Sequence, residues 1–195
     1  HDPGIDLWEL GYVEAADTAA ERFVAQVRAL EPARILTGSS RVLRALREPL
    51  PAGLGGLSPA EHLSEFLAGR VGAIEDAAAA VTTPVGQVAY HDPCALGRRC
   101  RVFDAPREVI TKVAGVAPAE FFHARAEAEC CGDGGLLPEV EPGLAARMAA
   151  AQAARLPEGV GKLVTACPGC KAQLATAAPD GVEVIDISEL VADRL

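Results

Sequence analysis

Three short segments decide the fold of this 195-residue chain: Tyr90-His91-Asp92-Pro93-Cys94, Cys130-Cys131-Gly132-Asp133-Gly134-Gly135 and Thr165-Ala166-Cys167-Pro168-Gly169-Cys170. They hold five of the six cysteines, and 35 residues separate Cys94 from Cys130, as 35 separate Cys131 from Cys167. Each segment lies where the chain leaves a predicted strand and enters a loop. Because the carboxyl ends of parallel strands meet at one edge of a sheet, the five thiols are expected to gather there.

The sequence around these segments alternates between helix and strand patterns. Apolar spacing, Pro and Gly stops and capping residues predict helices at 16–30, 40–46, from Ser58 onward, 104–114, 141–156, 167–178 and 186–195. Strands are predicted at 34–37, 85–91, near Phe121, 162–165 and 182–185, with a loop or turn over residues 1–15. This alternation predicts an α/β fold with parallel pairing and right-handed crossovers.

The chain also repeats itself. Residues 35–40 match 163–168, and residues 62–70 match 186–194. We therefore expect two related lobes with small parallel sheets flanked by helices and cysteine-bearing loops at the strand ends. The domains are predicted as 1–76 (the second half of a degenerate first repeat), 77–84 (a linker) and 85–195 (a complete second repeat). In the first repeat Ser39 and Val42 stand where Cys167 and Cys170 stand in the second, so it is expected to bind no metal.

Composition excludes several classes of function. A net charge of −9 argues against a nucleic-acid partner, which needs clustered Lys and Arg. There is no apolar run long enough for a membrane span. No Gly-x-Gly-x-x-Gly follows a predicted strand, so we expect neither flavin nor NAD in this chain. The cysteines indicate a reducing compartment, hence the cytoplasm, where partners could hold the chain at the inner face of a membrane. Because the chain begins with His1 rather than Met, we expect it to start inside a longer polypeptide.

One basic group stands out beside Cys94: Arg98, Arg99 and Arg101. It is either a solvated loop or a patch that compensates an anionic metal group or docks an acidic partner.

The cysteines allow four kinds of chemistry. Thiolates of Cys-x-x-Cys turns and distant cysteines hold iron–sulfur clusters, and Cys167, at a helix start, would face amide groups with partial positive charge. Gly132, Gly134 and Gly135 let backbone amides approach sulfur. A tetrahedral zinc site needs only four ligands, disulfides suit shorter secreted chains, and a dithiol centre at Cys167 and Cys170 leaves the other cysteines unexplained.

The three segments resemble the cysteine-rich "CCG" domain of heterodisulfide reductase. The same domain occurs in the iron–sulfur subunits of glycolate oxidase, lactate-utilisation and anaerobic glycerol-3-phosphate dehydrogenase systems. The resemblance implies a 4Fe–4S cluster, noncubane in heterodisulfide reductase, and it implies five ligands: Cys94, Cys130, Cys131, Cys167 and Cys170. Cys100 falls outside the pattern and is expected to be a free thiol. His91 and His123 are either hydrogen-bond donors to the cluster or ordinary polar side chains near strand ends.

The function implied by the resemblance is electron transfer inside an oxidoreductase. Its partners would be a flavoprotein or another iron–sulfur subunit, with a quinone or a low-potential carrier. We predict no catalytic residue and no activity for the chain alone. Two alternatives stay open: reduction of a disulfide substrate on the cluster, and a structural zinc-binding subunit.

Overall fold

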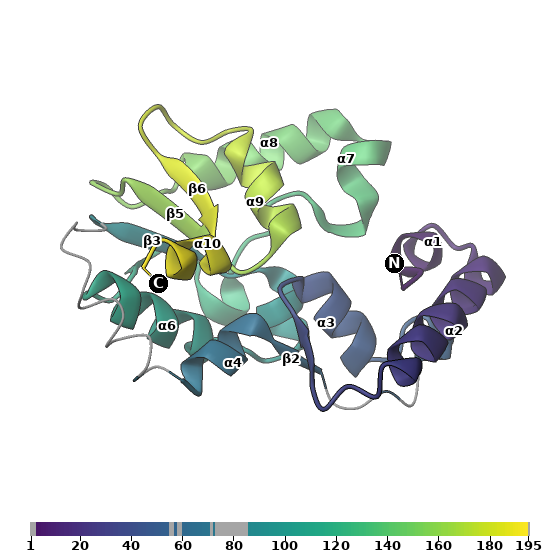
Figure 1. The fold of residues 1–195 in the computed structure, drawn as a ribbon. Helices are drawn as coiled ribbons and strands as arrows, with labels where there is room; N and C mark the ends of the chain where they lie inside the picture. The colour runs from purple at the N-terminus through teal and green to yellow at the C-terminus, as the bar shows by residue number, and fades with distance from the viewer. Residues whose placement is uncertain (1–2, 55–56, 58–59, 71, 73–85, 195) are drawn as a thin grey trace.

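The computed structural model describes residues 3–54, 57, 60–70, 72 and 86–194 (Figure 1). Its α-helices are α1 (Ile5–Glu9), α2 (Val13–Ala29), α3 (Ser40–Arg47), α4 (Leu63–Ala68), α6 (Asp104–Ala114), α7 (Leu137–Val140), α8 (Pro142–Ala153), α9 (Pro168–Ala175) and α10 (Ile187–Ala192). Its strands are β1 (Ile35–Thr37), β2 (Ala60–His62), β3 (Val88–His91), β4 (Ala119–Glu120), β5 (Lys162–Thr165) and β6 (Glu183–Asp186). Shorter helical turns are η1 (Ala52–Leu54), η2 (Ala95–Arg99), η3 (Arg125–Glu127) and η4 (Gly134–Leu136). The predicted α/β class is confirmed. Within the described residues, no helix combines the length and the apolar character that crossing a bilayer requires.

The main sheet has four parallel strands in the order β4-β3-β5-β6. At its centre His91 pairs with Thr165, which in turn pairs with Asp186. Thr165 also donates its hydroxyl hydrogen to the carbonyl of His91, with 3.2 Å between the oxygens. The strands therefore end level with one another, and the residues that follow His91 and Thr165 emerge at the same edge.

The two faces of this sheet bury different sets of side chains. On one face Tyr90 and Val164 pack against α6 and α10 and also against Leu43 and Ala60 of the first repeat. On the other face Ala89 and Leu163 pack in a second apolar cluster with Leu174 of α9, and this cluster also contains Cys131, Cys167 and Cys170. Alternation along buried strands thus gives the two faces of the sheet different clusters, and Cys131, Cys167 and Cys170 lie in the second.

The two segments that we predict to be related share an order of elements, and we keep the names first repeat and second repeat for them. The segment β1-α3-β2-α4 follows the same course as β5-α9-β6-α10, and in each the two strands pair in parallel. His62 caps α4 and Asp186 caps α10, and in both helices a glutamate three residues later accepts a hydrogen bond from the backbone N–H of the capping residue. The domain boundaries remain predictions, because the linker 77–84 lies outside the described residues.

Two local predictions are wrong. Residues 60–62 do not open a helix but form β2, which pairs with β1, and α4 begins only at Leu63. The strand pairing outweighs the capping pattern that Ser58 and Pro59 suggested. Residues 5–9 are helical rather than a loop, because Ile5 packs into the apolar cluster around α2.

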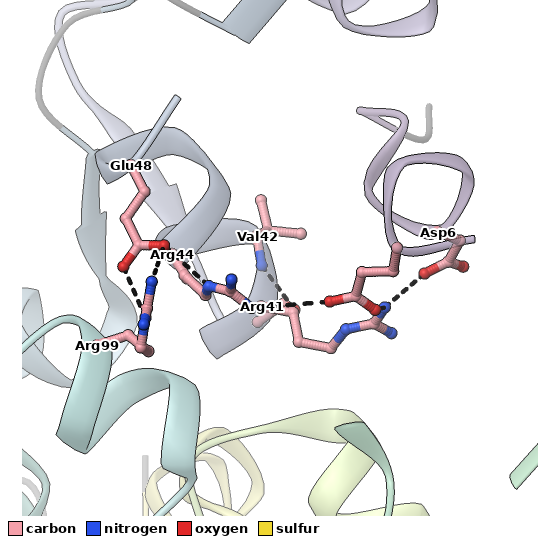
Figure 2. A network of polar contacts seen from close by, with 8 residues as sticks. Asp6, Arg41, Val42, Arg44, Glu48 and Arg99 are labelled. Atoms are coloured by element: carbon pink, nitrogen blue, oxygen red, sulfur yellow. Dashed lines mark hydrogen bonds and ion pairs between the residues drawn. The ribbon is translucent and has the colours of Figure 1, made fainter. Parts of the chain in front are cut away.

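Ion pairs join the first repeat internally and to the second (Figure 2). Arg41 of α3 reaches Asp6 and Glu9 of α1, each at 2.6 Å. Glu48, which ends α3, accepts two hydrogen bonds from Arg99 of η2, at 2.8 and 2.9 Å.

Most of the basic group beside Cys94 makes contacts within the chain. Arg98 donates to the carbonyls of Ala126 and Ala128, and Arg99 pairs with Glu48 as described. Two of the three arginines therefore hold segments of the fold in place.

His62 gives stability a dependence on pH. The ring is fully buried, with Nδ1 2.8 Å from the Ser64 hydroxyl and Nε2 3.3 Å from the Gly38 carbonyl. Burial lowers the pKa of His62 below its ordinary value. The unfolded chain therefore binds a proton at a higher pH than the folded chain. The contribution of His62 is complete above the ordinary pKa and is lost as the pH falls toward the lowered one.

We expect acidification from about pH 7 to about pH 5 to reduce the free energy of unfolding, with His62 contributing at most about 1.4 kcal/mol per pH unit. His62→Asn, which keeps a side chain able to cap α4, should lose less stability over the same range. Urea denaturation at several pH values measures both slopes. Identical slopes for the two proteins would contradict the assignment to His62.

Candidate metal centre

Two of the three cysteine-bearing segments directly follow strands, as the sequence predicts, whereas the Cys130-Cys131 segment does not follow a strand directly but lies in a loop beyond β4 and η3. Cys94 follows β3 and begins the π-helical turn η2. Cys130 and Cys131 lie between η3 and η4. Cys167 follows β5 as the N-cap of α9, and Cys170 lies in the first turn of that helix, as the sequence predicts.

The five thiols form a continuous row, which we call the thiol line. The sulfur of Cys131 lies 3.2 Å from the sulfur of Cys170. Neighbouring thiols interact in the order Cys94, Cys130, Cys131, Cys170, Cys167. Cys131, Cys167 and Cys170 are buried, whereas Cys94 and Cys130 are partly exposed. The structure thus brings together every cysteine that the resemblance proposes as a ligand.

Negative charge in the thiol line concentrates at two positions. Hydrogen bonds from Cys131, Cys94 and the backbone amides of Gly132 and Gly134 lower the pKa of Cys130. Hydrogen bonds from Cys170 and from backbone amides at the start of α9 lower the pKa of Cys167. The proton-bearing neighbours Cys94, Cys131 and Cys170 have raised pKa values for the reciprocal reason. This loop geometry favours thiolates, the form of cysteine that binds metal.

Gly132 allows the chain to pass close to the thiol line. Its φ is +98°, and its N–H donates to the sulfur of Cys130 at 3.4 Å. A Cβ on this residue would lie 2.7 Å from the carbonyl oxygen of Ala145 in α8. Both the left-handed backbone and the close approach to α8 require glycine here.

Gly132→Ala should therefore lower the free energy of unfolding by about 2 kcal/mol, the sum of backbone strain and displacement of the loop. Gly134→Ala is the matched control, since it lies in the same loop and a Cβ there meets open space. Its effect should stay within about 0.5 kcal/mol. Equal losses in the two variants, measured by urea denaturation, would show that the contact with α8 carries no cost.

His91 leaves a buried nitrogen beside the thiol line. Among the described residues its Nε2 has no hydrogen-bond partner, and a ring nitrogen lies within 4.8 Å of the sulfurs of Cys131 and Cys170. Burial lowers the pKa of His91 to about 4, so the ring is neutral near pH 7 and carries one N–H. A buried polar group without a partner costs free energy.

An anionic group at the thiol line would give this nitrogen a partner. Five thiols exceed the four ligands of a tetrahedral zinc ion, and Cys130 and Cys131 are adjacent in sequence. The residues present therefore fit an iron–sulfur cluster better than a single zinc ion.

A buried ion pair that sequence reasoning missed fixes the Cys94 loop. Arg107 of α6 makes a bidentate contact with Asp92, at 2.8 and 2.7 Å, and a second one with Glu120 of β4. Asp92 also accepts the backbone N–H of Arg125, at 2.7 Å. Asp92 thus ties the turn after β3 to the segment that leads to Cys130. In the sequence, only the carboxylate in the turn before Cys94 pointed to this ion pair. Its partner could not be identified, because that partner lies fifteen residues away on a helix.

A pocket of about 230 Å³ borders the thiol line on the side of the first repeat. Ser39, Arg41 and Val42 line it from the start of α3, and Asp133, Cys167 and Gly169 line it from the second repeat. The carboxylate of Asp133 lies so close to Gly169 that a Cβ there would overlap it. Burial raises the pKa of Asp133. The sequence did not single out Asp133 or this pocket.

The other candidates lie apart from the thiol line. Cys100 is a partly buried free thiol that packs against the core on the opposite face of the sheet, where burial raises its pKa. His123 makes an edge contact with Phe122, and their ring centres are 4.8 Å apart. His91 is the histidine that the structure places beside Cys131 and Cys170.

Comparisons with known proteins agree with this geometry. Residues 88–175 match a family model described as a cysteine-rich domain. The chain is 33% identical, over 98% of its length, to one subunit of the dihydromethanophenazine:CoB–CoM heterodisulfide reductase of Methanosarcina barkeri, and it covers 49% of that subunit. It is 32% identical, over 66% of its length, to one subunit of the fumarate reductase (CoM/CoB) of Methanothermobacter marburgensis, covering 26% of it.

A third relative is the probable iron-sulfur-binding oxidoreductase FadF of Bacillus subtilis. The two are 33% identical over 55% of this chain, which covers 16% of the relative. The chain spans about half the length of the heterodisulfide reductase subunits that it matches.

Proposed function

Because residues 88–175 of this chain belong to the cysteine-rich domain family, as the sequence motifs predict, we propose that the chain transfers electrons through an iron–sulfur cluster inside a multi-component oxidoreductase. The observation that carries the proposal is the thiol line, in which five cysteines from three distant segments converge at one edge of a parallel sheet. Relatives named as reductase subunits or as iron–sulfur-binding support it.

In this proposal Cys94, Cys130, Cys131, Cys167 and Cys170 hold a 4Fe–4S cluster, and the number of thiols favours the noncubane kind. When bound, the cluster supplies one-electron reduction and oxidation. The residues of the chain hold it, exclude water and stabilise its charge. The amides of Gly132 and of the first turn of α9 donate to sulfur, and such bonds favour the more negative reduced state.

The chain would work beside partners. We place a flavoprotein or another iron–sulfur subunit on one side of the electron path, and a quinone or a low-potential carrier on the other. We also propose that residues 1–76 are a degenerate repeat without a cluster and that residues 85–195 are the complete domain. The site of action would be the cytoplasm, or the inner face of a membrane through a partner.

A second candidate function is reduction of a disulfide substrate on the cluster. The pocket of about 230 Å³ that borders Cys167 favours it, because a substrate there would lie next to a ligand of the cluster. The first repeat counts against it, since Ser39 and Val42 occupy the places of two thiols.

Anaerobic purification followed by iron, sulfide and zinc analysis tests the proposal. We expect about four irons and about four sulfides per chain, a brown colour and a signal in electron paramagnetic resonance in one oxidation state. About one zinc per chain without sulfide would replace the proposal with the structural alternative. Iron-loaded chain that cleaves a disulfide with a chemical reductant and no partner would favour the second candidate.

A further inference from the structure

The last residue of β3 directs a polar ring toward the cysteines. Side chains alternate along a strand, so His91 lies on the same face of the sheet as Ala89, whose cluster contains Cys131 and Cys170. His91 is 2% exposed, and its Nε2 has no hydrogen-bond partner among the described residues. A ring nitrogen and the sulfurs of Cys131 and Cys170 all lie within 4.8 Å of one another. The three atoms are therefore close enough to contact one bound group together.

The neighbours of His91 fix the position of its ring. The backbone of His91 pairs with Thr165 in the sheet. The ring makes an edge contact with Phe121, with 6.3 Å between the ring centres and 87° between the planes. Phe121 is itself buried and belongs to the same cluster as Cys131 and Cys170. The ring is thus held beside the two sulfurs.

A second buried histidine shows how the fold satisfies such a ring with its own atoms. His62 is fully buried, and its two ring nitrogens lie 2.8 Å from the Ser64 hydroxyl and 3.3 Å from the Gly38 carbonyl. Both nitrogens of His62 therefore have partners, whereas Nε2 of His91 has none among the described residues. Because buried polar groups are ordinarily hydrogen-bonded, the Nε2 of His91 indicates a partner that these residues do not supply.

We propose that Nε2 of His91 carries the ring proton and donates a hydrogen bond to a sulfur atom of the bound iron–sulfur cluster, which raises the reduction potential of that cluster. This inference rests on the proposed function and adds a side-chain donor to the backbone amides that face the thiol line. Reduction adds an electron to an anionic cluster, so a donor to its sulfur stabilises the reduced state more than the oxidised state. The ring is buried, and such a bond is strongest where water is excluded.

A bond from the nitrogen to iron is the alternative. In clusters with histidine ligands, histidine takes the place of cysteine. Here Cys131 and Cys170 both remain free thiols beside the ring, and the thiol line already contains all five cysteines of the three segments. No thiol is missing for His91 to replace, so its nitrogen is left to donate to sulfur.

Redox titration of the iron-loaded chain and its variants tests the inference. His91→Phe and His91→Leu both replace the ring N–H with apolar atoms. Each should keep the iron and sulfide of the wild-type protein, and each should shift the equilibrium for one-electron reduction by about tenfold toward the oxidised state, or about 59 mV. His91→Gln, whose amide N–H can take the place of Nε2–H, should restore most of the wild-type potential. His123→Phe is the matched control and should leave the potential unchanged, since His123 contacts Phe122 apart from the thiol line.

A spectroscopic measurement on the wild-type protein does not depend on the stability of any variant. The iron-loaded chain, labelled with ¹⁵N in histidine alone, should show a weak ¹⁵N coupling in pulsed electron paramagnetic resonance of the paramagnetic oxidation state. The coupling should be weak because a hydrogen bond transfers little spin density to the nitrogen. His91→Phe should lose this coupling, and His123→Phe should keep it.

The outcomes separate the two proposals. Wild-type potential in both apolar His91 variants, with iron retained, would overturn the role of His91 and leave the proposed function intact. So would iron-loaded wild-type protein without a histidine coupling, or with the strong coupling of a nitrogen bonded to iron. Equal shifts of potential in the His91 and His123 variants would also overturn it. Wild-type protein that binds no iron would overturn the proposed function, and this inference with it.

Discussion

Replacing Cys131 with alanine is expected to remove most of the iron from the purified chain. Cys131 is the middle member of the thiol line, is 2% exposed and contacts both Cys130 and Cys170. The loss should reduce iron from about four atoms per chain to less than about one, because no unassigned thiol among the described residues lies nearby to replace the missing ligand.

Cys100→Ala is the matched control. It also removes a partly buried thiol, but Cys100 packs against the opposite face of the sheet, so iron content should stay at the wild-type level. Ser39→Ala should likewise leave iron unchanged. Metal analysis and optical spectra after anaerobic purification measure all three. Equal loss of iron from the Cys100 and Cys131 variants would mean that the ligand assignment is wrong.

The second large effect is expected at Arg107. Arg107→Met keeps an apolar side chain of similar length but leaves the carboxylate of Asp92, 2% exposed, without its cation. Removing one partner of a buried ion pair typically costs about 3–5 kcal/mol, and we expect a loss of that size in the free energy of unfolding. The Cys94 loop should loosen too, because Asp92 holds it.

Arg125→Met is the comparison for Arg107. The side chain of Arg125 pairs with Asp104 on the surface, where the two side chains are 49% and 84% exposed, so its loss should cost less than about 1 kcal/mol. Adding Asp92→Asn to Arg107→Met should recover part of the loss, since it removes the uncompensated charge. Urea denaturation of the four proteins gives the energies. A small effect of Arg107→Met alone would show that Asp92 is solvated or protonated.

The parts of the site that could be predicted from the sequence follow from periodic rules. Parallel strands end at one edge, so the positions of Cys94 and Cys167 after β3 and β5 were enough to predict that their segments meet. The location of Cys167 as the N-cap of α9 followed from Pro168 at the first helical position.

The missed features depend on contacts distant in sequence. A three-residue strand such as β2 has no detectable period, and only its pairing with β1 distinguishes it from the start of a helix. The partners of Asp92 belong to other segments, and no local pattern specifies which side chains meet. The glycine at position 169 could be read only as part of a cysteine turn, whereas the structure shows that Asp133 occupies the space beside it.

The core shared by the two repeats has a consequence for how such a chain can change over generations. In our proposal the first repeat holds no metal ligand, so metal binding gives no reason to retain it. Leu43 and Ala60 of the first repeat, however, complete the apolar cluster that contains Tyr90 and Val164 of the second. Removing β1-α3-β2-α4 would expose that cluster to water, so this segment cannot be lost without cost to the rest of the chain.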